Sequence, residues 1–427
     1  MIEKELLKRI LAEQRENLLR KPSGIKRDAL AVVLSKKRLP HVVVLTGLRR
    51  SGKSTMLKQI SEELYSKNDF YYLSFEDERL AGITAAEFNY LYETIVEMFG
   101  PFKTFLIDEI QNVPQFENFV RRFYDNGFKF YITGSNARLL SREIGTKLTG
   151  RHIDIEVKPF NFREYLKAKG EEINETSLLL TEHRAKLIKM FNKFLTGGGI
   201  PEYVLYEENE LLLNIYNDIV YKDIFARYSI DDIKRTKSLY ANLISNVGQK
   251  FSYNSLKNSL DYGSGNTVRT HIHYLEETYL IRVAEQFQYS TKKQVRSDKK
   301  IYVIDNGIQR LVSTKYMEDR GWMLENLTVN SISSLDNLYY FFGSGECDII
   351  YFINNKEPMP IQITWELTPG NREREIAGLI EAMRYLRVKK GYILTHWQDD
   401  EFTIEGKKIV VISALKWFLS QSMRELI

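Results

Sequence analysis

The sequence predicts an α/β protein whose first part is a parallel β-sheet with helices on both faces. Mostly apolar runs at residues 41–46, 70–75, 104–107 and 129–133 are typical of buried strands. Segments long enough for helices separate these runs. This alternation favours a parallel sheet, because each connection between parallel strands has to cross the sheet. A chain of 427 residues has room for about two to four domains.

The other elements follow in order along the chain. Residues 2–20 have the apolar spacing of a leader helix, and residues 160–226 are mostly helical with a turn at 197–201. Three short helices and a hairpin are expected in residues 228–310. In the remainder, alternating runs predict strands at 339–342, 348–353 and 360–365, followed by an amphipathic helix at 372–386 and a strand at 391–395.

The composition excludes several classes of protein. Hydrophobic residues make up 43% and charged residues 27%, too apolar for a disordered chain. No run reaches the length of a membrane-spanning helix, and the charged start lacks the apolar core of a signal peptide. The single cysteine, Cys347, excludes an internal disulfide framework and a multi-thiolate zinc site. We therefore expect a cytoplasmic protein.

A glycine-rich loop follows the first strand and fits the pattern G-x-x-x-x-G-K-[ST]. Its backbone N–H groups can point at phosphate oxygens, and the helix that follows adds a partial positive charge. Lys53 is expected to reach the β- and γ-phosphates, and the Ser54 hydroxyl to bind Mg²⁺. The alternative is a chance glycine-rich turn. The predicted nucleotide-binding residues are Gly47, Leu48, Arg49, Arg50, Ser51, Gly52, Lys53, Ser54 and Thr55.

Two acids end the third apolar run, at the edge of the sheet where ligands bind. Asp108 would hold Mg²⁺, and Glu109 would polarise the attacking water as a general base. The alternative is a solvated acidic turn. After the fourth run, a small polar side chain can orient that water. Asn136 is the first candidate and Ser135 the second, with a turn or helix cap as the competing interpretation.

Six motifs in this order resemble one family: residues 47–55, 108–111, 133–136, 148–151, 159–165 and 198–202. The chain resembles AAA+ superfamily ATPases of an archaeal and bacterial family whose C-terminal half is a domain of unknown function. The resemblance implies a RecA-like ATPase core at 28–160, after a leader at 1–27. It also implies a helical segment at 161–227, a winged-helix-like domain at 228–310 and a degenerate restriction-endonuclease-like domain at 311–427.

The resemblance also implies ATP bound between subunits of a homo-oligomer, with an arginine from the neighbouring subunit. Arg151 matches the Gly-Arg pair of the family, and Arg138 and Arg142 compete with it. The alternative for Arg151 is a structural ion pair. Arg49 and Arg50 could touch phosphate or a neighbouring subunit, and the spacing does not decide between them.

The excess of positive charge lies in the middle of the chain. The net charge is +5, and residues 231–300 hold twelve Lys and Arg against seven Asp and Glu. Helix–turn–helix spacing fits residues 251–260 and 267–279, and a basic hairpin follows. A protein-interaction module is the competing interpretation. The DNA-contact candidates are Asn266, as a helix cap, with Arg269, His273, Lys292, Lys293, Arg296, Lys299 and Lys300.

The C-terminal segment resembles a nuclease core in which acids bind Mg²⁺ and a lysine helps to orient and activate water. Glu325 lies in a predicted helix and Asp348 opens a predicted strand. Gln362 and Thr364 stand where a charged ligand and the lysine are expected, so nuclease activity is not expected.

These observations predict a Mg²⁺-dependent ATP hydrolase whose ATP cycle rearranges subunits or domains and acts on or with DNA. The alternative is a nucleotide-dependent switch that binds a protein partner. An ATP-regulated nuclease is the third possibility.

Overall fold

The computed structural model describes residues 2–65, 69–84, 87–134, 145, 150–173, 178–315, 319–332, 338–353 and 356–420. The chain forms two compact units, Met1–Phe160 and Asn161–Ile427. We describe each unit by itself.

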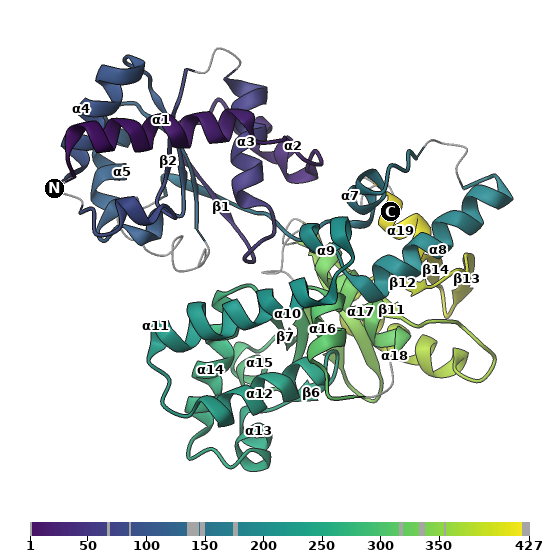
Figure 1. Ribbon diagram of the computed structural model, residues 1–427. Helices are drawn as coiled ribbons and strands as arrows, with labels where there is room; N and C mark the ends of the chain where they lie inside the picture. The colour runs from purple at the N-terminus through teal and green to yellow at the C-terminus, as the bar shows by residue number, and fades with distance from the viewer. Residues whose placement is uncertain are drawn as a thin grey trace. The chain divides into compact units, whose positions relative to one another are not determined.

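Unit 1 contains a five-stranded parallel sheet in the order β2-β3-β4-β1-β5. Figure 1 labels β1 and β2 of this sheet and the helices around it. The predicted strands are confirmed, and β5 is an additional edge strand. The strands are β1 (Val42–Thr46), β2 (Tyr71–Ser74), β3 (Thr104–Asp108), β4 (Lys129–Thr133) and β5 (His152–Glu156). The helices are α1 (Lys4–Arg20), α2 (Asp28–Ser35), α3 (Lys53–Leu64), η1 (Glu78–Leu80), α4 (Phe88–Phe99), η3 (Ile110–Asn112) and α5 (Phe116–Asp125).

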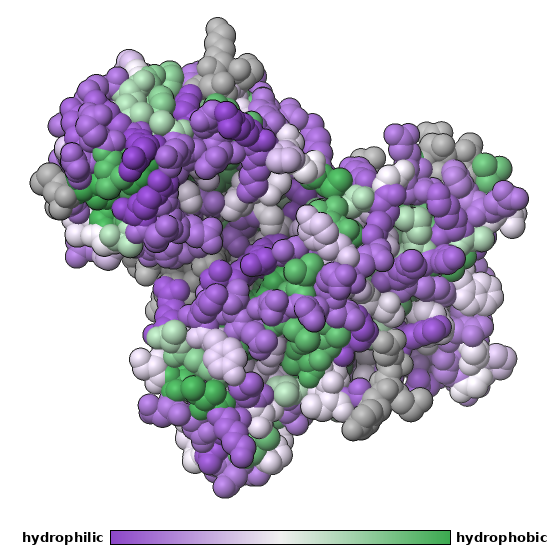
Figure 2. Space-filling model, in the orientation of Figure 1, coloured by the Kyte–Doolittle hydropathy of each residue, from purple (hydrophilic) through white to green (hydrophobic). Residues whose placement is uncertain are grey.

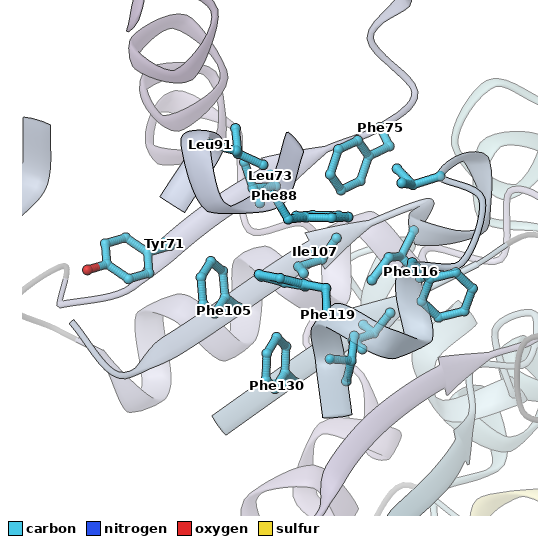
Figure 3. Close-up of a cluster of buried hydrophobic side chains, with 14 of the residues drawn as sticks. Tyr71, Leu73, Phe75, Phe88, Leu91, Phe105, Ile107, Phe116, Phe119 and Phe130 are labelled. Carbon is cyan, nitrogen blue, oxygen red and sulfur yellow. The ribbon is translucent and has the colours of Figure 1, made fainter. Parts of the chain in front are cut away.

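Alternate side chains of each strand point to opposite faces of this sheet, and helices cover and bury both faces. One face packs against α1, α4 and α5, and the other against α2 and α3. Figure 3 shows the first of these clusters, where Phe105, Phe119 and Phe130 lie close together. The Phe88 and Phe119 rings stack with centroids 4.0 Å apart. Apolar side chains on both faces explain why these strands read as continuous apolar runs.

Unit 2 contains a nine-stranded mixed sheet in the order β13-β14-β12-β11-β10-β9-β7-β8-β6. The strands are β6 (Lys250–Phe251), β7 (Ile281–Gln286), β8 (Lys299–Val303), β9 (Leu338–Phe342), β10 (Glu346–Ile353), β11 (Glu357–Ile363), β12 (Lys390–Thr395), β13 (Asp400–Ile404) and β14 (Lys407–Ser413). Strands β7 and β9 pair in parallel. The sheet therefore runs without a break from the expected winged-helix segment into the C-terminal segment.

Helices of unit 2 come mostly before and between these strands. They are α7 (Phe162–Ala168), α8 (Thr181–Gly197), α9 (Pro201–Tyr206), α10 (Asn209–Asp218), the π-helix η4 (Ile219–Phe225), α11 (Ala226–Tyr228), α12 (Ile233–Ser245), α13 (Tyr253–Ser259), α14 (Gly265–Glu277), α15 (Thr291–Arg296), α16 (Asn306–Val312), α17 (Arg320–Ser331), α18 (Arg372–Tyr385) and α19 (Ala414–Leu419). In Figure 2 a hydrophobic area interrupts the mostly hydrophilic surface over the region of α10. None of the described helices is long and apolar enough to cross a membrane.

Asp305, the N-terminal cap of α16, forms hydrogen bonds with the glycine turn at residues 197–201 that follows α8. The Asp305 carboxylate is buried and accepts hydrogen bonds from the backbone N–H groups of Gly199 (2.6 Å) and Gly307 (2.9 Å). Gly198 has a φ of +80°, and a Cβ atom there would lie 2.1 Å from Asp305 Oδ1. The turn therefore needs glycine both for its backbone conformation and for this close approach.

One detail of the helix–turn–helix prediction is wrong. Helix α14 starts at Gly265, and its cap is Ser264, whose Oγ accepts the Asn266 N–H at 3.1 Å. A serine hydroxyl reaches the free N–H groups of a first turn well, so Ser264 takes the capping position predicted for Asn266. The expected hairpin is confirmed, since β7 and β8 pair antiparallel, and the basic stretch between them forms the short helix α15.

Candidate functional site: a phosphate-binding loop

The glycine-rich loop connects β1 to α3 at the carboxyl edge of the unit 1 sheet. Gly47 has a φ of +131°, and a Cβ atom there would lie 2.3 Å from the Val157 carbonyl oxygen. Gly52 has a φ of +100° and precedes the first residue of α3. Both positions therefore require glycine for the chain to curl between strand and helix.

Lys53 points back into this loop. Its side chain is buried, and Nζ donates hydrogen bonds to the carbonyl oxygens of Leu48 (2.8 Å) and Gly47 (3.1 Å). Ser51 Oγ is buried, with no hydrogen-bond partner among the described residues. A buried ammonium and an unsatisfied hydroxyl beside the start of a helix fit the oxygens of a phosphate group.

Asp108 and Glu109 lie at the end of β3, as predicted, and Thr133 at the end of β4 links them. The Thr133 hydroxyl donates to Asp108 Oδ1 and accepts the Glu109 backbone N–H at 3.1 Å. Burial raises the pKa of Asp108, while hydrogen bonds from Thr133 and Ser54 act in the opposite direction. The Gln111 side-chain amide donates to Glu109 Oε2.

The donor set at this position fits a magnesium ion. The hydrogen bond between Ser54 and Asp108 brings a hydroxyl and a carboxylate together, and both are oxygen ligands. Mg²⁺ is usually held by one or two such protein groups together with substrate phosphates and water. Ser54 and Asp108 are therefore the residues that would hold it.

The structure places Arg151 just before β5, where its Nη1 lies 2.7 Å from Asp125 Oδ1. Both side chains are about half exposed. Arg151 thus has a partner in its own unit, and its predicted contact with a neighbouring subunit stays a prediction. Arg49 is partly buried in the loop and Arg50 is exposed. Four further candidates lie outside the described residues: Ser135, Asn136, Arg138 and Arg142.

The structure separates the DNA-contact candidates in unit 2 into two groups. Arg269, Arg296 and Lys299 line a pocket of about 400 Å³ between α13, α14 and α15, together with Ser264 and Asn266. Lys299 is itself buried, and its Nζ donates to the carbonyl oxygens of Val295 and Ser297. The remaining exposed candidates are His273 on α14 and Lys292 and Lys293 on α15. His273 Nε2 lies 3.3 Å from Glu277 Oε1.

Lys300 points inside unit 2 instead, so the structure does not support the DNA contact predicted for it. It is 1% exposed and lies beside Glu325 and Asp348, two of the nuclease-like positions. Burial, with the neighbouring Glu325 carboxylate, raises the pKa of Asp348 to about 7. The other two nuclease-like positions have other partners: Gln362 Nε2 donates to Glu375 Oε2 at 2.7 Å, and the Thr364 hydroxyl to the Glu366 carbonyl oxygen at 3.2 Å.

Comparisons with known proteins identify the family. A family profile described as an AAA domain matches residues 39–166. A second, described as a domain of unknown function (DUF8612), matches residues 188–315. The uncharacterized protein MJ1544 of Methanocaldococcus jannaschii is 33% identical, and the match covers 98% of this chain and 97% of that protein. The chain belongs to the AAA+ ATPase family that includes MJ1544.

Another relative in the same comparison is an uncharacterized protein of Haemophilus influenzae. It is 28% identical, over 90% of this chain and 95% of that protein. Among solved structures, the AMPPCP-bound DnaA from Aquifex aeolicus is 18% identical with a TM-score of 0.25, over 62% of this chain and 91% of that chain. A similarity this low carries no argument about function.

Two residues of this AAA+ ATPase site were not found from the sequence. One is Thr133, described above. The other is Arg27, which is buried and donates from Nη1 to the Ser51 carbonyl oxygen (2.8 Å) and from Nη2 to that of Lys158 (2.6 Å). Arg27 thus fastens the phosphate loop to the chain after β5. A lone arginine between two helices gives no sequence signal of that contact, whereas Thr133 could have been found as the last residue of its strand.

Proposed function

We propose that the protein hydrolyses ATP in a Mg²⁺-dependent reaction. The observation that carries the proposal is the meeting of Lys53 and Ser54 from the loop after β1 with Asp108 and Glu109 at the end of β3. The first pair suits the phosphates of a nucleotide, and the second supplies a metal-binding carboxylate and a base. The AAA+ ATPase fold and family support this assignment.

Each side chain has a distinct part in the proposed reaction. Lys53 exchanges its bonds to loop carbonyls for bonds to the β- and γ-phosphate oxygens. Bound Mg²⁺ supplies positive charge that offsets the charge on those oxygens. Glu109 accepts a proton from the water that attacks the γ-phosphorus, and Thr133 holds the backbone at Glu109 in place.

Phosphate release from Mg-ATP tests this proposal. We expect Glu109→Gln to lower the rate by at least about a hundredfold, because the amide cannot accept the proton. ATP binding, followed by a fluorescent analogue, should persist. The control is Glu93→Gln, the same substitution at an exposed position on α4. A wild-type rate in Glu109→Gln would contradict the role of this residue. The absence of hydrolysis by the wild type would leave a nucleotide-binding switch.

We also propose that unit 2 contacts DNA through the pocket between α13, α14 and α15. Of the residues that line it, the charged ones are Arg269, Arg296 and Lys299, and the first turn of α14 adds its partial positive charge. Lys292 and Lys293 extend the basic surface along α15. Such an arrangement suits the phosphates of a DNA backbone and carries no base preference.

Two features of the proposal concern partners. ATP bound between subunits of a homo-oligomer would bring Arg151 of one subunit to the phosphate loop of another, at the expense of its ion pair with Asp125. The competing function is a nucleotide-dependent switch that holds a protein partner on unit 2. ATP hydrolysis that is lost in Glu109→Gln but unaffected by DNA would favour that switch.

A further inference from the structure

A buried cluster of charges lies in unit 2 around Lys300 of β8. The Lys300 Nζ lies 2.6 Å from Glu346 Oε1, 3.0 Å from Glu325 Oε1 and 3.3 Å from Asp348 Oδ1. Glu325 comes from α17, and the other two acids come from β10. One ammonium group therefore contacts three carboxylates at once.

Other donors of the protein also contact these three carboxylates. The Tyr302 hydroxyl donates to Glu325 Oε1 at 2.7 Å, and the Ile363 backbone N–H donates to Asp348 Oδ2 at 2.9 Å. Lys250 of β6 lies 3.1 Å from Glu346 Oε2. The protein itself supplies the hydrogen-bond donors that a buried carboxylate needs.

These residues do not fit the metal site of a nuclease core. The positions of the expected third ligand and lysine are Gln362 and Thr364, which are engaged with Glu375 and Glu366. Among the described residues, no group of three or more His, Cys, Asp and Glu side chains is arranged to hold a metal ion. Lys300 reaches both Glu325 and Asp348, the two acids that such a site would use.

We propose that the ammonium group of Lys300 is the resident cation of this site and excludes a divalent metal ion from it. With all three carboxylates ionised, they and the two lysines leave at most one net negative charge, so the cluster is nearly balanced without any ion from solution. A divalent ion between Glu325 and Asp348 would lie against a buried positive charge, which is costly at low dielectric.

The electrostatic surroundings of Lys300 agree with this role. Burial lowers the pKa of Lys300, but the charges of Glu325, Asp348 and Glu346 raise it by more, to well above the ordinary value. The amine therefore stays protonated at neutral pH. A permanently charged lysine can replace a metal ion in balancing carboxylates, but it cannot activate a water molecule as a metal ion does.

Binding of Mn²⁺ alone, without nucleotide, tests the proposal on the full-length protein. Electron paramagnetic resonance counts the bound ions. We expect the wild type and Asp348→Asn to bind the same number, because Asp348 already holds Lys300. In Lys300→Ala, we expect one new Mn²⁺ site, at least about tenfold tighter than in the Lys300→Ala/Asp348→Asn double variant. Thermal unfolding with and without Mn²⁺ follows the same site.

Two outcomes would overturn the proposal. One is a Mn²⁺ ion bound by the wild type and lost in Asp348→Asn. The other is a folded Lys300→Ala protein that binds no additional Mn²⁺. If Lys300→Ala folds only when Mn²⁺ is present, the ion has replaced the ammonium and the proposal holds. If it does not fold at all, the comparison of wild type with Asp348→Asn decides, since that pair does not depend on the alanine variant.

Discussion

At the scale of single residues, the most informative side chains are those whose partners are distant in sequence. The sequence pattern favours Ser135 and Asn136 as the polar residues after β4. In the structure, the Thr133 hydroxyl contacts both Asp108 and Glu109. In the sequence, Lys300 is one of five basic residues in a predicted hairpin. Its carboxylate partners in the structure, Glu325 and Asp348, lie 25 and 48 residues later in the chain. A local charge pattern cannot reveal such partners.

Thr133 gives a sharp prediction at this scale. Replacing Thr133 with Val keeps the shape of the side chain but removes the hydroxyl that joins Asp108 to Glu109. We expect phosphate release to fall by about tenfold or more, because a hydrogen bond to a charged group contributes about 1.5–3 kcal/mol. ATP affinity should change by less than about threefold. Steady-state kinetics separates the two effects.

The matched control is Thr104→Val. Thr104 is also buried and is the first residue of the neighbouring strand β3, so it lies at the amino ends of the strands, away from the site. An equal loss of activity in both variants would indicate a general effect of the substitution on the sheet rather than a role for Thr133 at the site.

At the scale of elements, sequence patterns predicted best where strands are buried on both faces. The central strands of unit 1 gave clear apolar runs for this reason. The edge strands β5 and β13 were missed because solvent reaches much of each, which weakens the apolar pattern. The glycine turn at 197–201 was predicted as a turn, but its attachment to Asp305 was not, because Asp305 lies 106 residues from Gly199.

Asp305 makes the junction between that turn and α16 sensitive to pH. Burial raises the pKa of Asp305 to about 6 from an ordinary 3.8, although backbone N–H groups act against the shift. The folded protein therefore holds this proton more tightly than the unfolded chain. This tighter proton binding stabilises the folded protein by about 3 kcal/mol below about pH 4, and the stabilisation is lost as the pH rises through about 6.

Asp305→Asn should remove this pH dependence. We expect the variant to be less stable than the wild type at low pH, because the NH₂ group of the new asparagine side chain would face the Gly199 N–H and cannot accept its hydrogen bond. The difference between the two proteins should shrink between about pH 4 and pH 7. Urea unfolding across this range measures it. Asp319→Asn, the same change at the exposed cap of α17, is the control. A stability difference that stays constant with pH would contradict the prediction.

At the scale of the whole molecule, the sequence predicted an AAA+ ATPase, and the family match confirms that assignment. The continuous sheet of unit 2 could not be predicted, because it depends on the pairing of β7 with β9, more than 50 residues apart in sequence. The nuclease-like resemblance placed Glu325 correctly on a helix and Asp348 and Gln362 on strands, whereas Thr364 lies one residue after the end of β11. It gave no indication that a lysine from β8 would lie between the two acids.

DNA binding also belongs to this scale, because phosphate contacts act together over a surface. We expect neutralising Lys292, Lys293 and Arg296 to Gln to weaken binding to duplex DNA of any sequence. The slope of log affinity against log salt should fall by about 2 to 3, since each phosphate contact contributes about 0.9. Fluorescence anisotropy at several salt concentrations measures this slope.

A second triple variant controls for net charge. Arg387, Lys389 and Lys408 are exposed elsewhere in unit 2 and lose the same charge when changed to Gln. An equal effect of both triples would show that the contact is not localised to α15. Unchanged binding in the first triple would refute DNA contact through this surface.

The pairing of β7 with β9 has a consequence for how this chain could have evolved. Strands β6 to β8, which flank helices α14 and α15 in sequence, share one hydrogen-bonded sheet with the strands that follow residue 311. A recombination point between the two parts would leave β7 with an unpaired edge, open to pairing with other chains. Separating the part of the protein that we propose to meet DNA from the part that resembles a nuclease would therefore require a new cover for this edge.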